Sequence, residues 1–248
     1  MTEIFQTILY QPIFNLFVGL YDLVPDVGVA ILIITVLLKL ALYPLTSKSI
    51  NAQKSLSELQ PKMDALKAKY KDDQQTLAQE TMKLYKEHKV NPFGSCLPLL
   101  IQLPIFLSLY WVLRDGLSSN NFEMLYAFIQ NPGHINTVSL GIFELANPNI
   151  VLGVFAGAAQ YWQAKMFSIK KAPQKAGEGA KDENMMTMMN KQMLYFMPIM
   201  TVIISTQLPG GLALYWFLST LAQALQQHFI LKKSKEENSD VIEGTIIE

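Results

Sequence analysis

An apolar run from Val27 to Leu45 is interrupted by a single charged residue, Lys39. A helix of about 20 apolar residues is long enough to cross a lipid bilayer, so the run predicts a membrane span that carries this lysine inside it. A charge in the middle of a span costs about 2.5–3.5 kcal/mol even on the lenient insertion scale. We therefore expect Lys39 to have a partner, a hydrated cavity or a functional role.

Four further apolar segments follow the first one, and the charged fraction of 16% is below the roughly 25% of an ordinary soluble domain. The pattern predicts an all-α membrane protein with five transmembrane helices. The turn signal Pro209-Gly210-Gly211 indicates that the last two spans form an antiparallel hairpin. The four segments are Cys96–Leu113, Ile150–Ser168, Met193–Leu208 and Leu212–Ile230.

The lysines orient these spans, because most of them fall in three groups that alternate with the spans. The groups are nine lysines over positions 48–89, six over positions 165–191, and Lys232, Lys233 and Lys235 in the tail. Basic loops stay on the cytoplasmic side of a membrane. The distribution therefore predicts an N-terminus outside, a C-terminus in the cytoplasm, and an outer loop over residues 115–149.

The remaining segments divide the chain into regions. Residues 1–24 have apolar side chains at helical spacing and predict an amphipathic helix on the outer face, with a sixth span as the alternative. Residues 25–230 form the five-span core, which includes a cytoplasmic helical hairpin at 46–90 and a cytoplasmic loop at 169–190. Residues 231–248 are predicted to be a disordered acidic tail.

Apolar residues at alternating steps of three and four predict that the hairpin closes along a coiled-coil seam. Pro61 is expected near a helix start or a kink. The seam residues are Leu56, Leu59, Met63, Leu66 and Tyr70 on one side, and Leu77, Thr81, Leu84 and His88 on the other.

Polar side chains occur within every span, where lipid cannot satisfy their hydrogen bonds. We expect them to face a common interior around Lys39. Two alternatives stay open: Lys39 extends toward the inner interface, or the polar residues are simply contacts between helices. The predicted interior set is Lys39, Thr35, Gln102, Gln160, Thr201, Ser205 and Gln223.

The sequence offers no nucleophile–base order, no glycine-rich phosphate loop and no paired carboxylates within the spans. Cys96 is the single cysteine, and the three histidines are far apart, so no metal site is predicted. We expect neither a cofactor nor an enzymatic active site. Without an acid in the spans, a proton-coupled transporter is disfavoured.

Three separated motifs resemble the YidC/Oxa/Alb family of membrane protein insertases, over roughly residues 5–230. The motif positions are Lys39 to Pro44; Asn91, Pro92 and Pro98, running on to Gln102 and Pro104; and Pro198, followed by Pro209, Gly210, Tyr215 and Trp216.

The resemblance implies a five-helix core around a polar groove that is open to the cytoplasm and to lipid and closed outside. The family usually has arginine in this groove, and Lys39 keeps the charge but loses the planar fork. The implied location is the bacterial plasma (inner) membrane.

The implied function is to move newly made membrane proteins from the cytoplasm into the bilayer, with the substrate helix sliding between the third and fifth spans. Nascent membrane proteins and membrane lipid are the expected partners, the ribosome and the Sec translocon are candidates, and no specific nucleic acid sequence is expected. One alternative function is a small channel or transporter with an intramembrane lysine, and another is an assembly chaperone that folds its partners without inserting them.

Overall fold

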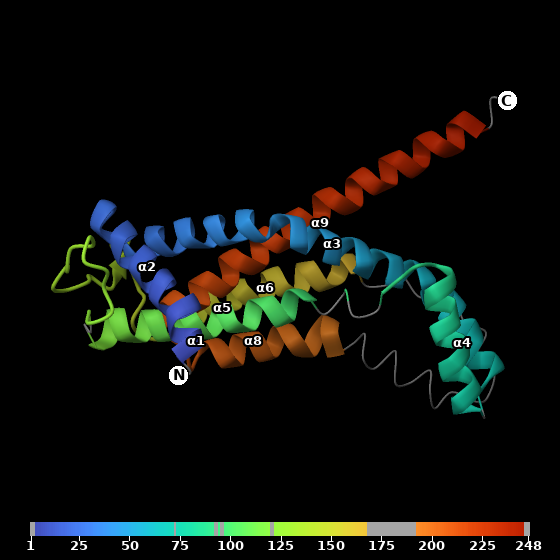
Figure 1. The fold of residues 1–248 in the computed structure, drawn as a ribbon, viewed down its shortest axis with the longest axis horizontal. Coiled ribbons are helices and arrows are strands. Elements are labelled where there is room, and N and C mark those ends of the chain that lie inside the picture. Colours follow the sequence, from blue (N-terminus) through green and yellow to red (C-terminus); the bar gives the residue numbers. More distant parts are fainter. Residues whose placement is uncertain are drawn as a thin grey trace.

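The computed structural model describes residues 3–71, 73–91, 94, 97–119, 122–167 and 192–245. Within these ranges the fold is mostly helical, with one small two-stranded sheet. Pro92, Cys96 and the predicted loop 169–190 lie outside the described residues. Figure 1 shows the long helices side by side, with a loop region at one end and a helical hairpin at the other.

The N-terminal segment consists of α1 (Glu3–Phe5), a π-helical turn η1 (Gln6–Tyr10) and α2 (Gln11–Leu23). It runs across one end of the bundle rather than along it (Figure 1). Its length and composition alone would also allow it to cross a membrane.

Helix α3 (Val27–Lys69) begins at Asp26, whose side chain accepts a hydrogen bond from the Val29 amide at 3.0 Å. The helix continues through both Pro44 and Pro61. Of the two expectations for Pro61, a helix start is wrong, because the residue lies inside α3, and a kink stays a prediction. Pro61 is exposed, so water can reach the carbonyl that the proline leaves without an amide partner.

Helix α4 (Gln74–Glu87) starts at the N-cap Asp73 and packs back against the second half of α3. Two residues of the predicted seam, Leu59 and Leu84, are buried. The Tyr85 hydroxyl lies 3.1 Å from the Met63 sulfur. The helical hairpin expected from the heptad spacing is present, and α3 joins it to the bundle without a break.

The other bundle helices are α5 (Leu97–Leu113), α6 (Ile150–Phe167), α8 (Met197–Ser205) and α9 (Gly210–Thr245), with π-helical turns η3 (Arg114–Ser119) and η4 (Gln192–Phe196). Helix α6 packs against both α8 and α9, which have few contacts with each other. The turn after α8 is tight, as predicted, but the two helices it joins do not form a closely packed pair.

Two glycines explain how α6 comes so close to α8. A Cβ atom on Gly153 would lie 2.7 Å from the Ser205 Cβ, and one on Gly157 would lie 2.9 Å from the Pro198 carbonyl oxygen. Small residues four apart allow helix backbones to approach closely in membranes. This contact places α6 between α8 and α9.

Helix α9 continues to Thr245, through the segment that the sequence predicts to be a disordered tail. The helix extends away from the bundle (Figure 1). In the sequence, lysines at 232 and 233 precede glutamates at 236 and 237 by four positions, a spacing of opposite charges that favours helix over coil. Over residues 231–245 the structure therefore differs from the expected disorder.

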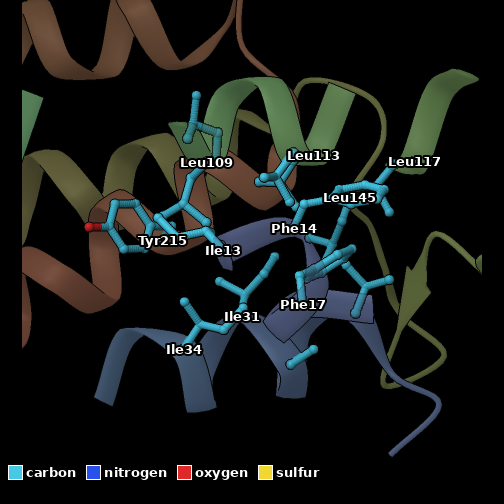
Figure 2. Close-up of a cluster of buried hydrophobic side chains, with 14 of the residues drawn as sticks. Ile13, Phe14, Phe17, Ile31, Ile34, Leu109, Leu113, Leu117, Leu145 and Tyr215 are labelled. Atoms are coloured by element: carbon cyan, nitrogen blue, oxygen red, sulfur yellow. The ribbon is translucent and has the colours of Figure 1, made fainter. Parts of the chain in front are cut away.

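A buried apolar core lies at the end of the bundle that α2 crosses. Figure 2 shows side chains from α2, α3, α5 and α9 gathered in one cluster with Leu145 of the loop before α6. The labelled residues are Ile13, Phe14, Phe17, Ile31, Ile34, Leu109, Leu113, Leu117, Leu145 and Tyr215.

The loop before α6 completes this end of the molecule. It carries a short hairpin of β1 (Val138–Ser139) and β2 (Phe143–Glu144). The Asn15 side chain holds the loop to α2, because its amide donates to the Met124 carbonyl at 2.9 Å and its oxygen accepts from the Tyr126 amide at 2.6 Å. The loop and α2 together cover the apolar core.

Candidate functional site: the polar interior of the bundle

Lys39 is half-buried on α3, and its ammonium lies 3.3 Å from the side-chain oxygen of Gln223 on α9. Among the described residues Lys39 forms no ion pair. A neutral amide leaves most of the positive charge uncompensated, because an ammonium has three donors and Gln223 occupies one. The charge therefore remains available to an anionic group.

Thr35 lies one turn before Lys39 and is buried. Its hydroxyl donates to the Ile31 carbonyl of the same helix at 2.7 Å. The proton of this hydroxyl is thus already used within α3. Thr35 retains only acceptor capacity toward any group that enters the interior.

Gln102 on α5 donates to the Tyr215 hydroxyl on α9 at 2.7 Å. The neighbouring Trp216 ring meets Phe106 edge-on, with ring centroids 5.1 Å apart. The two aromatic residues of the sequence motif therefore attach α5 to α9. The polar contact of Tyr215 and the apolar contact of Trp216 thus join the same two helices.

A second polar group lies where α6 meets α8, and it consists of Gln160, Thr201 and Ser205. None of the three hydrogen-bonds to Lys39. The Thr201 hydroxyl donates to the Gln160 side-chain oxygen, and Ser205 donates to the Thr201 carbonyl at 2.6 Å. The bond between Thr201 and Gln160 is a polar contact between two helices, whereas that of Ser205 lies within α8. The predicted set thus separates into several pairs rather than one hydrogen-bonded cluster.

The sequence reasoning missed two glutamines next to Gln223. Gln226 donates to the Ser47 hydroxyl at 2.9 Å and to the Tyr43 carbonyl at 3.2 Å, on either side of Pro44. Gln227 is buried and donates to the Gln163 carbonyl of α6 at 3.2 Å. Three glutamines within five residues of a span were the signal that could have revealed them.

The proline and glycine positions of the motifs mark helix boundaries and bends. Pro44 lies inside α3, Pro104 lies inside α5, and Pro198 is in the first turn of α8. Gly210 begins α9, and its amide donates to the Asn147 carbonyl at 2.9 Å. The remaining positions are Asn91, which precedes α5, Pro98 in the first turn of α5, and Pro209 in the turn before α9.

The first half of α5 is the loosely packed side of the interior. None of the residues from Leu97 to Pro104 is buried, whereas Ile105, Leu109 and Leu113 in the second half are. Helices α5 and α8 have almost no close backbone contact. Helices α6 and α9, between which the substrate path is expected, form the most extensively packed pair.

Three helical stretches are long and apolar enough to cross a membrane: Glu3–Leu23, Val27–Lys69 and Leu97–Leu117. A shorter apolar stretch covers Leu194–Ser205. These assignments rest on length and composition among the described residues. The first, second and fourth predicted spans agree in position with Val27–Lys69, Leu97–Leu117 and Leu194–Ser205, respectively.

Comparisons with known proteins agree with this architecture. The family described as 60Kd inner membrane protein matches residues 19–237. A membrane protein insertase YidC of Fusobacterium nucleatum is 39% identical over 210 residues, which cover 85% of this chain and 88% of that protein. The YidC of Clostridium tetani is 37% identical over 214 residues, which cover 86% of this chain and 84% of that protein.

A solved structure of an active YidC insertase, with its first transmembrane domain resolved, is 27% identical with a TM-score of 0.55. The match covers 89% of this chain and 45% of that one. Given the family match over most of its length, the chain belongs to the 60Kd inner membrane protein family, which places it among relatives that are YidC membrane protein insertases.

Proposed function

We propose that this protein inserts newly made membrane proteins into the bacterial inner membrane. The observation that carries the proposal is Lys39, a half-buried ammonium within an apolar helix whose hydrogen-bond partner is a neutral amide. An acidic segment of a substrate would lower the cost of this charge, and the charge would lower the cost of moving the acid into the bilayer.

The proposed arrangement has five spans, formed by α3, α5, α6, α8 with η4, and the first part of α9. The N-terminus is outside and the C-terminus is in the cytoplasm, as the lysine distribution indicates. Helix α2 lies on the outer face, and the α3–α4 hairpin receives the substrate in the cytoplasm, where the ribosome and the Sec translocon would also contact it.

The substrate path runs along α5 and α8. The exposed side chains of α5 and the scarcity of contacts between the two helices support this choice. A polar substrate segment would meet Lys39, Gln102 and Gln223 in a hydrated groove, while its apolar helix passes directly into lipid. Burial of that apolar surface drives the step without a nucleotide.

The test is insertion of a single-span substrate with an acidic outer tail into liposomes that contain only this protein. We expect Lys39→Leu and Lys39→Glu to reduce insertion by roughly tenfold, equivalent to about 1.4 kcal/mol. Lys48→Leu is the matched control, since it removes an exposed lysine from the same helix. A substrate with a neutral tail should be much less affected.

Unchanged insertion by both Lys39 variants would overturn the role of the charge. The same liposomes test the alternative function, because a channel or transporter would produce solute flux that depends on Lys39. Flux without insertion would replace the insertase proposal with that alternative.

A further inference from the structure

The turn between β1 and β2 exposes large apolar side chains at the end of the molecule that α2 crosses. Leu140 is 68% exposed and Ile142 is 77% exposed. Leu23, at the end of α2, is 77% exposed. None of these side chains contributes to the buried core, so the packing of the fold does not account for them.

Leu140 also occupies an unfavourable backbone conformation. Its φ is +52°, and Gly141 follows with a φ of +71°. The Ile142 amide donates to the Ser139 carbonyl at 3.0 Å, which closes the turn. Turns with two positive φ values favour Asn-Gly or Asp-Gly, so a leucine here opposes local stability. An exposed leucine at such a position indicates a role outside the fold.

Asp26 fixes the position of this turn at the start of α3. Its carboxylate accepts from the Ser139 hydroxyl at 2.6 Å and from the Leu140 amide at 2.7 Å. Ser139 also lies directly against Gly28, where a Cβ atom would overlap the serine side chain. The turn therefore sits at the level of the first turn of α3.

An exposed apolar stripe on α3 begins at the same place. Leu32, Val36 and Leu40 follow Gly28 at steps of four, so they lie along one side of the helix, and all three are exposed. In the proposed arrangement this stripe faces lipid. The β1–β2 turn, which contacts Asp26 and Gly28, lies at the start of this stripe.

We propose that the β1–β2 turn inserts Leu140 and Ile142 into the outer leaflet, at the boundary between headgroups and acyl chains. This inference rests on the membrane placement of α3 in the proposed function. Residues 115–149 contain no lysine or arginine, so the attraction comes from apolar burial rather than from anionic lipid. Side chains at such a boundary are buried by about 5–10 Å.

The experiment measures fluorescence quenching in liposomes of neutral lipid. An environment-sensitive fluorophore is attached to Ile142→Cys in a Cys96→Ala background, and quenchers are placed either at shallow positions on the lipid or in the water outside. His134→Cys is the matched control, because His134 is a polar, exposed residue of the same loop.

We expect shallow lipid quenchers to act about threefold more strongly on the probe at 142 than on the probe at 134. Added anionic lipid should not change this ratio. Equal access of both probes to the aqueous quencher would overturn the proposal. Because no substrate is present, the result does not depend on insertase activity.

A second variant separates membrane contact from folding. Leu140→Asn suits the positive φ, so its thermal transition should stay the same or rise, while lipid quenching of the 142 probe decreases. A lower transition temperature would show that Leu140 stabilises the fold and would overturn the argument from its conformation.

Discussion

The two ends of the bundle are built differently. At the end that α2 crosses, α2, α3, α5 and the loop before α6 enclose an apolar core that includes Phe14 and Phe17 (Figure 2). Toward the other end, polar side chains such as Thr46, Ser49 and Gln227 are buried beside a few apolar ones. The difference indicates that the apolar core contributes most of the packing, whereas the other end combines buried polar groups with a loosely packed first half of α5.

The largest effect is expected in the apolar core at the end that α2 crosses. Phe17→Ala removes a fully buried ring, and such truncations cost about 3–5 kcal/mol. A thermal unfolding scan in detergent should show a large decrease in the transition temperature. Phe229→Ala is the control, since that ring is largely exposed; equal decreases for the two variants would contradict the comparison.

A smaller effect is expected where α6 meets α8. Gly157→Leu places a side chain where a Cβ atom alone would be 2.7 Å from the Val202 Cγ2. Overpacking of this kind costs about 1–3 kcal/mol. Val154→Leu enlarges an exposed residue of the same helix and should be neutral in the same thermal scan. A stable Gly157→Leu protein would mean that α6 and α8 can separate.

The Asp26 contacts should contribute about 1 kcal/mol to the free energy of unfolding, the usual value of an N-cap. Burial opposes ionisation of this carboxyl, but hydrogen bonds from Leu140, Ser139 and Val29 outweigh it and hold the pKa below its ordinary value of 3.8. A lowered pKa stabilises the fold above pH 3.8, and this stabilisation is lost as the pH falls through the folded-state pKa.

Asp26→Ala should therefore lower the transition temperature at neutral pH. In strong acid, the transition temperatures of the variant and of the parent protein should differ less. Asp22→Ala, which removes an exposed acid of the same segment, is the control. A difference that stays constant from neutral pH to strong acid would show that the charge of Asp26 does not matter.

The smallest effect is expected where Gln102, in the loosely packed first half of α5, contacts Tyr215. A double-mutant cycle with Gln102→Leu and Tyr215→Phe should give a coupling of about 0.6 kcal/mol, the average for hydrogen bonds between membrane helices. A coupling several times larger would show that α5 is held firmly, and it would remove the difference between the two ends.

The sequence predicted the features that depend on local pattern. Apolar length located the helices of the bundle, and heptad spacing located the α3–α4 hairpin with Leu59 and Leu84 inside it. These features follow from periodicity along single helices.

The sequence did not predict which helices are neighbours. Gly153 and Gly157 look ordinary in an apolar run, yet they allow α6 to lie between α8 and α9. The contacts of Asn15 with residues 124 and 126 join segments more than 100 positions apart in the chain. Such contacts depend on tertiary packing, which a pattern within one segment does not contain.

The unbroken course of α3 has a mechanical consequence. From Pro44 to Lys69 the helix extends about 37 Å at 1.5 Å per residue. Gln226 contacts the helix on both sides of Pro44, so α9 holds α3 about one turn beyond Lys39. Because α3 continues from this contact into the hairpin, we expect a movement of the hairpin to shift the contact with Gln226.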